Sequence, residues 1–138
     1  MFQVVIAEPI DPEGLSLLEA ASDVTCAQLT DADRPALLAA LTDAHVLVIG
    51  GRTLVDAGLL RAAPHLKIVA VAGLGMENVD LGAATERSVM VMNMPRLHAN
   101  ASAEYTVGLM LALARHIPPA DRSLRRGEWL PEIGRAHV

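Results

Sequence analysis

The sequence predicts an α/β protein built on a doubly wound, five-stranded parallel sheet. Short apolar runs alternate along the chain with segments that carry leucine and alanine at helical spacing. The apolar runs lack strict apolar–polar alternation, a pattern typical of strands that are buried on both faces. A regular alternation of strands and helices implies right-handed crossovers and a parallel sheet covered by helices on both sides.

Five apolar runs account for the predicted strands, at residues 2–7, 24–27, 45–50, 67–72 and 89–93. Helical patterns fill the gaps between them, at residues 12–21, 31–41, 55–63 and 80–87. Asp31 and Asp80 stand where helix N-caps are expected, because a carboxylate there accepts a hydrogen bond from the first turn. Pro35 then falls in the first turn of its helix, where proline is tolerated.

The composition indicates one soluble globular domain with a substantial core. The chain has 138 residues, of which 52% are hydrophobic and 20% charged, and its formal net charge is -5. An acidic chain with 2% aromatic residues lacks the basic surface and stacking platforms of nucleic-acid binders, so that class is excluded. The longest apolar run, near residues 107–114, is too short to span a membrane. The single cysteine, Cys26, favours a cytoplasmic protein without an intramolecular disulfide.

The loop after the fourth predicted strand matters most, because doubly wound sheets bind ligands beyond the carboxyl ends of their strands. It reads VAGLGMENVD, in which Gly73 and Gly75 are followed by Asn78 instead of a third glycine. A dinucleotide fingerprint needs that third glycine at the start of a helix, so no cofactor site is predicted here. Two alternatives stay open: an ordinary tight turn, or a turn whose bare amides bind a small anion. His45 and His65 lack metal-ligand spacing, and no metal site is predicted.

Two longer stretches of the sequence are more specific than this loop alone. Two consecutive runs read AAPHLKIVAVAGLGMENVDLGAATERSVMVMNMP and SAEYTVGLMLALARHIPPADRSLRRGEW. Together they closely resemble the N-terminal part of the D-isomer-specific 2-hydroxyacid dehydrogenases, and among them the phosphoglycerate dehydrogenases. The resemblance implies a flavodoxin-like substrate, or catalytic, domain at residues 1–100 and an interdomain crossover helix and connector at residues 101–131. It also implies a Rossmann domain that binds NAD, which is absent from this sequence.

The resemblance gives the glycine loop a role in substrate binding. In the family, backbone amides of the matching loop hold the substrate carboxylate, which assigns that task to Leu74 and Gly75. Arg52 and His98 are further candidates for substrate binding. Phosphoglycerate dehydrogenases usually carry an arginine where this chain has Gly50, so the resemblance leaves open whether the substrate is phosphorylated. The catalytic residues of the family all fall outside this chain.

For several of these positions, a role without substrate binding is also open. Arg52 is equally typical of a solvated loop, and His98 is typical of a surface residue near a helix start. Asn100 or Ser102 is expected to cap the helix that follows. That helix, at residues 101–115, is apolar almost all round and needs cover on nearly every side, from a missing domain or from its own sheet.

Two function classes follow. The preferred one is the substrate-domain fragment of an NAD-dependent oxidoreductase that interconverts a D-2-hydroxy acid and a 2-oxo acid. Its parent enzyme is expected to be a homodimer, and this chain alone is expected to be inactive. The alternative is a stand-alone flavodoxin-like module that binds a small carboxylate without turnover. Residues 132–138 are expected to be an artefact, because IGRAHV matches the translation of a widely used sequencing adapter.

Overall fold

The structure is a computed structural model that describes residues 1–30, 32–96 and 99–129. The chain divides into two compact units, Met1–Leu97 and His98–Val138, and each unit is described by itself. The first unit contains the sheet and its four connecting helices, and two further helices belong to the described part of the second unit. The expected artefact at residues 132–138 lies outside the described residues.

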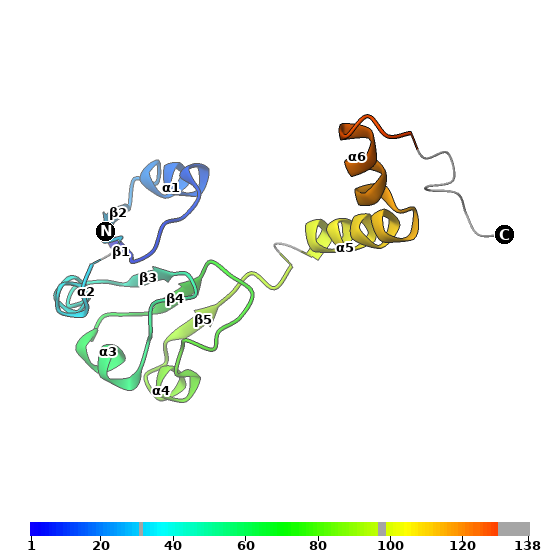
Figure 1. Ribbon diagram of the computed structural model, residues 1–138. Coiled ribbons are helices and arrows are strands. Elements are labelled where there is room, and N and C mark those ends of the chain that lie inside the picture. The colour runs from blue at the N-terminus through cyan, green and yellow to red at the C-terminus, as the bar shows by residue number, and fades with distance from the viewer. Residues whose placement is uncertain (31, 97–98, 130–138) are drawn as a thin grey trace. The chain divides into compact units, whose positions relative to one another are not determined.

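Five strands form one parallel sheet in the first unit (Figure 1). They are β1 (Phe2–Ile6), β2 (Val24–Gln28), β3 (Val46–Ile49), β4 (Ile68–Val71) and β5 (Met90–Met92). The strand order is β2-β1-β3-β4-β5, and Val4 of β1 is in register with Cys26 on one side and with Val46 on the other. This order is the one found in flavodoxin-like sheets, so the predicted fold class is confirmed.

Four helices connect the strands: α1 (Pro12–Glu19), α2 (Arg34–Leu41), α3 (Ala57–Ala62) and α4 (Leu81–Glu86). Each follows an aspartate whose carboxylate accepts a backbone N–H of the first turn. Asp80 caps α4 as predicted, but the cap of α2 is Asp33, so the prediction of Asp31 is wrong. Position 33 is correctly spaced because its carboxylate reaches the Ala36 N–H at 2.9 Å, just beyond Pro35, which has no N–H to donate.

One face of the sheet carries the hydrophobic core. Helices α2, α3 and α4 lie on this side, and α1 lies on the other (Figure 1). Fully buried side chains of the core include Leu41, Leu47, Ile49, Leu59, Leu60 and Val69. On the opposite face Val48 and Ala70 are only half-buried, and Met92 is exposed. Helices therefore lie on both sides of the sheet, as predicted, and α1 is the one described helix of the first unit on the second side.

The second unit begins with α5 (Ala99–Ala114), which is followed by α6 (Ile117–Arg125). Between them His116 adopts a left-handed conformation with a φ of 53°. One expectation is corrected here: Asn100 and Ser102 lie inside α5 and do not cap it. The predicted connector contains α6, and Pro118 falls in the first turn of this helix, where proline is tolerated. Across the described ranges, no helix is both long and apolar enough to cross a membrane.

Candidate functional site

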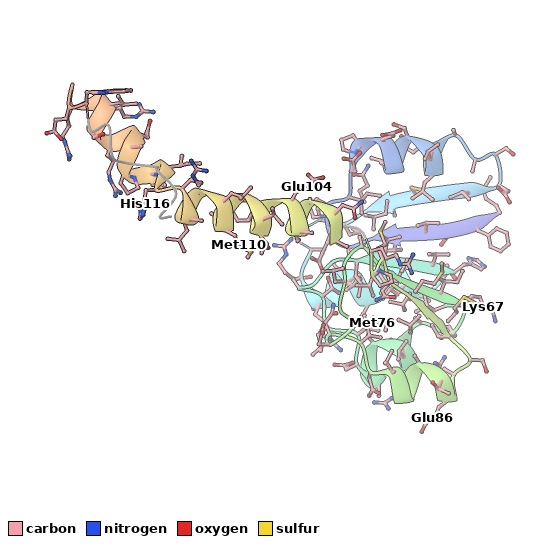
Figure 2. The ribbon with its side chains drawn as sticks, turned by 90° about the vertical axis from the view of Figure 1, so that its right-hand side faces the viewer. Lys67, Met76, Glu86, Glu104, Met110 and His116 are labelled. Atoms are coloured by element: carbon pink, nitrogen blue, oxygen red, sulfur yellow. The ribbon has the colours of Figure 1, made fainter. Side chains whose placement is uncertain are left out.

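The loops after β3 and β4 lie side by side at the carboxyl edge of the sheet. Val55 in the first loop and Val79 in the second form an isolated parallel bridge, and the Val55 N–H donates to the Asn78 carbonyl at 2.8 Å. Figure 2 shows Lys67, just before β4, and Met76, after it, at opposite ends of the sheet. The paired loops therefore lie at the end of the sheet where doubly wound folds bind ligands.

The side chain of Asn78 joins the two loops. Its Nδ2 donates to the carbonyl oxygen of Gly50 at 3.1 Å and to that of Thr53 at 2.8 Å. Asn78 stands where a dinucleotide fingerprint would have its third glycine, and its side-chain amide holds the two loops together. Because both contacts are to backbone carbonyls, the β3–α3 loop is fixed to the β4–α4 loop at two points by one residue.

The glycine loop is held from the β5 side. The Gly73 carbonyl accepts a hydrogen bond from the Met94 N–H at 2.9 Å, and the Leu74 carbonyl accepts one from Asn93 Nδ2 at 2.6 Å. In a trans peptide the N–H points opposite to the preceding carbonyl, so the amides of Leu74 and Gly75 point away from these partners. Within the described ranges neither amide donates a hydrogen bond, so two adjacent backbone donors are available.

Leu74 and Gly75 line a cavity of about 320 Å³. Residues of both loops line it, including Gly51, Val71, Leu74, Gly75 and Glu77. The Glu77 carboxylate stands so close to Gly75 that a β-carbon there would meet it. The described lining of this cavity contains no Lys, Arg or His. The arrangement is suited to one small anionic group bound by backbone donors.

A second cavity, of about 350 Å³, lies where β1 and β3 end. Its charged lining residues are Glu8, Arg34 and Arg52. Arg52 Nε donates to Glu8 Oε2 at 3.4 Å, and Arg34 donates to the Asp56 carboxylate at 2.6 Å. Both guanidinium groups therefore face a carboxylate of the same unit.

The four predicted substrate-binding residues do not share one cavity. Leu74 and Gly75 line the first cavity together, whereas Arg52 lines the second. His98 lies outside the described residues, so its role stays a prediction. Among the three predicted residues that the structure describes, it brings Leu74 and Gly75 together in one cavity and places Arg52 at another.

Glu8 is a residue of this edge that the sequence analysis missed. Its buried side chain accepts the backbone N–H groups of Thr53 at 2.7 Å and Arg52 at 3.1 Å. A β-carbon on Gly50 would lie 2.5 Å from Glu8 Oε2, so the carboxylate fills the space where a side chain at position 50 would begin. No sequence signal reveals these contacts, because the partners are 44 and 45 residues away and follow no periodic pattern.

The hydrogen bonds to Glu8 change its acidity. Burial raises the pKa of the carboxyl, but the hydrogen bonds from Thr53, Gly50 and Arg52 outweigh burial and hold the pKa below its ordinary value of 4.5. A depressed pKa contributes stability that is present above the unfolded-state pKa. That contribution is lost as the pH falls through the folded-state pKa.

We therefore expect the free energy of unfolding to decrease as the pH falls below 4.5, and Glu8→Gln to remove part of this decrease. At pH 7 the variant is expected to be less stable by roughly 1–3 kcal/mol, because the partly buried hydrogen bonds from the loop amides lose a charged acceptor. Urea unfolding at pH 7 and at about pH 3 measures both quantities. The same change at the exposed Glu86 is the control. An acid dependence that is identical in wild type and Glu8→Gln would contradict this account of the loop.

The described residues do not fit a dinucleotide cofactor. Residues 76–80 separate Gly75 from the start of α4 at Leu81, whereas a dinucleotide loop runs directly into its helix. The Asp80 carboxylate accepts the Ala83 N–H at 2.9 Å, so the helix end is capped internally and is not open to a pyrophosphate. The described ranges also contain no group of three or more side chains that could hold a metal ion.

A sequence profile for the catalytic domain of the D-isomer specific 2-hydroxyacid dehydrogenases matches residues 4–129. The chain belongs to this family. The resemblance seen in the glycine loop and the following helix is thereby confirmed. Members of this 2-hydroxyacid dehydrogenase family are NAD(P)-dependent.

Relatives of the chain include enzymes with two different activities. The chain is 44% identical over 126 residues to the D-3-phosphoglycerate dehydrogenase of Mycobacterium bovis, a match that covers 91% of this chain and 24% of the relative. It is 37% identical over 130 residues to the hydroxypyruvate reductase of Thermotoga maritima, with 93% of this chain and 42% of the relative covered. This 2-hydroxyacid dehydrogenase chain therefore spans less than half the length of either relative.

Solved structures that are similar to this chain include two dehydrogenases or reductases of 2-hydroxy or 2-oxo acids. The 2-hydroxyacid dehydrogenase of Ketogulonicigenium vulgare Y25 has a TM-score of 0.82 and 28% identity, covering 100% of this chain and 45% of that one. The NADPH-dependent glyoxylate/hydroxypyruvate reductase of Sinorhizobium meliloti, in complex with NADP and malonate, has a TM-score of 0.72 and 27% identity. That match covers 99% of this chain and 41% of the reductase.

Proposed function

We propose that this chain is the substrate domain of an NAD-dependent dehydrogenase that interconverts a D-2-hydroxy acid and a 2-oxo acid. The observation that carries the proposal is the pair of backbone amides at Leu74 and Gly75. The two amides donate no hydrogen bond within the described residues, and the two residues line a cavity at the ligand-binding edge of the sheet. The family and the activities of the relatives support the same reaction.

In this proposal the two amides bind the substrate carboxylate. Backbone donors suit this task because their direction is fixed and they add no side chain near the reacting carbon. The hydrogen bonds from Met94 and Asn93 to the loop carbonyls orient the donors before substrate arrives. Asn78 holds the facing loop in place. Arg52, which pairs with Glu8 at the neighbouring cavity, is proposed as a further contact to the substrate.

The remaining parts of the enzyme are proposed to lie in a nucleotide-binding domain outside this chain. The nicotinamide cofactor supplies or accepts the hydride when it is bound there. Residues 1–100 form the proposed substrate domain and residues 101–131 the proposed crossing to the second domain. A long apolar helix such as α5 supports this division, because it needs cover from a neighbouring surface. The complete enzyme is proposed to be a homodimer.

Two assays test the proposal. The chain alone is expected to give only background oxidation of NADH and NADPH with a panel of 2-oxo acids, because its described residues hold no dinucleotide site. The complete protein encoded by the same gene is expected to reduce at least one of these acids. Turnover by the chain alone would contradict the assignment as a substrate domain. No turnover by the complete protein, with any acid and either cofactor, would contradict the proposed reaction.

A further inference from the structure

We propose that Glu8 is a positioning residue of the substrate site: it holds the β3–α3 loop and directs Arg52 of that loop towards the substrate. The inference rests on the proposed function, in which Arg52 is a further contact to the substrate. It adds a residue that acts through Arg52 and does not itself touch the substrate. The contacts of the loop backbone, the ion pair of Arg52, the space at Gly50 and the place of Arg52 on the loop support it.

The backbone of the β3–α3 loop is held from both neighbouring strands. Glu8 follows β1, and its carboxylate accepts the N–H groups of Arg52 at 3.1 Å and Thr53 at 2.7 Å. Asn78 follows β4 and donates to the carbonyl oxygens of Gly50 and Thr53. Since β1 and β4 lie on either side of β3, the loop is fixed from two directions. The backbone of Arg52 itself is one of the points that Glu8 holds.

The same carboxylate also contacts the side chain of Arg52. Arg52 Nε lies 3.4 Å from Glu8 Oε2, and the side chain of Arg52 is 69% exposed whereas that of Glu8 is 9% exposed. An ion pair with so exposed a partner adds little to the free energy of unfolding. Its effect is on direction: Nε is the inner nitrogen of a planar, rigid guanidinium, and a contact there to an anchored carboxylate orients the whole group.

Gly50 provides the space that Glu8 needs. A β-carbon at position 50 would lie 2.5 Å from Glu8 Oε2 and 3.1 Å from its carboxyl carbon. Any side chain there would push the carboxylate away from the amides of Arg52 and Thr53. Glu8 and Gly50 therefore act as a matched pair, and a substitution at either position is expected to release the loop in the same way.

Arg52 begins close to the proposed carboxylate site. Gly51, the preceding residue, lines the cavity that Leu74 and Gly75 also line, while Arg52 lines the neighbouring cavity with Glu8. A long, exposed side chain that starts one residue from the first cavity is suited to contact a substrate bound there. Because an arginine loses conformational freedom when it binds a ligand, orienting it beforehand lowers the cost of binding. The loss of Glu8 is therefore expected to weaken substrate binding.

A double-mutant cycle in the complete protein tests the inference, with Glu8→Gln, Arg52→Ala and the two combined. We expect Glu8→Gln to raise the KM for the preferred 2-oxo acid by about three- to tenfold, with kcat and the KM for the cofactor nearly unchanged. In the Arg52→Ala background the same change is expected to have no further effect on KM, because the residue through which Glu8 acts is gone. Gly50→Ala is expected to reproduce the effect of Glu8→Gln.

Glu86→Gln is the matched control, because it makes the same chemical change at an exposed position on α4 (Figure 2). The control is expected to leave the KM for the 2-oxo acid unchanged. If Glu8→Gln does not fold, Glu8→Asp takes its place in the cycle, since it keeps the charge and moves the carboxylate by one methylene.

Three results would overturn the inference. The first is a KM for the 2-oxo acid that the change at Glu8 does not raise. The second is an increase that is equally large with Arg52 and with alanine at position 52, which would show that Glu8 does not act through the arginine. The third is a parallel loss of kcat and of cofactor affinity, which would show a general effect on folding. A complete protein that reduces no 2-oxo acid would contradict the proposed function instead, which keeps the two failures distinct.

Discussion

Gly75→Val in the complete protein is expected to lower kcat/KM for the preferred 2-oxo acid by about 100-fold or more, the scale of losing one fixed backbone donor to an anion. The new β-carbon would meet the Glu77 carboxylate, and the methyl groups would enter the cavity that the substrate carboxylate needs. The KM for the nicotinamide cofactor is expected to stay unchanged, because the described residues hold no dinucleotide site. Steady-state kinetics with each substrate varied in turn measures both effects.

Gly14→Val controls for the added bulk. A β-carbon on Gly14 has nothing within 4 Å, and valine inside a helix costs less than about 1 kcal/mol relative to alanine. This variant is expected to retain its activity. Equal losses in substrate and cofactor use by Gly75→Val, or an equal loss in the control, would show that the substitution acts through folding and not through the carboxylate site.

The chain on its own is expected to self-associate at micromolar concentration through α5. The apolar side chains of this helix that are more than half exposed are Val107, Leu109, Met110, Leu111 and Leu113. Within the second unit, α6 is the described helix that packs against α5, and it leaves these side chains uncovered. Each large apolar side chain in water forgoes roughly 1.5–3 kcal/mol of burial, so several together strongly favour another surface.

Leu113→Glu is expected to shift the chain towards monomer, because it places a charge at the most exposed of these side chains, which is 78% exposed. Leu17→Glu is the matched control: Leu17 is 71% exposed on α1, and its replacement is expected to leave the size distribution unchanged. Light scattering across a concentration series measures both. A wild-type chain that is monomeric and binds no hydrophobic dye would contradict the need for an outside partner and would favour the stand-alone module.

The sheet was predictable because its signal is local. Runs such as residues 45–50 and 67–72 are apolar, short and separated by helical patterns, and each became a parallel strand within a residue or two of the predicted ends. The strand order follows from the family resemblance and from the usual crossover rules. The loop glycines were also visible, since Gly73 and Gly75 follow a strand at the edge where ligands bind.

The rest depends on contacts that a single sequence does not encode locally. Glu8 meets its partner amides more than forty residues away, and nothing in EPIDPEG marks it as their acceptor. Asp31 and Asp33 are equally good caps by composition, and only the geometry around Pro35 selects the second. Helix α6 was read as a connector because its polar residues and two prolines dominate the pattern. The direction of the Gly75 amide depends on Asn93, which donates to the Leu74 carbonyl of the same peptide group from nineteen residues away.

An NMR titration of this chain with pyruvate tests the central claim most directly, namely that the Leu74 and Gly75 amides bind the substrate carboxylate. We expect the backbone amide resonances of both residues to shift in a saturable way, and we expect no such shift with methyl pyruvate, which has the same 2-oxo group but no carboxylate. Saturable shifts elsewhere in the chain, with the resonances of Leu74 and Gly75 unmoved, would contradict the claim.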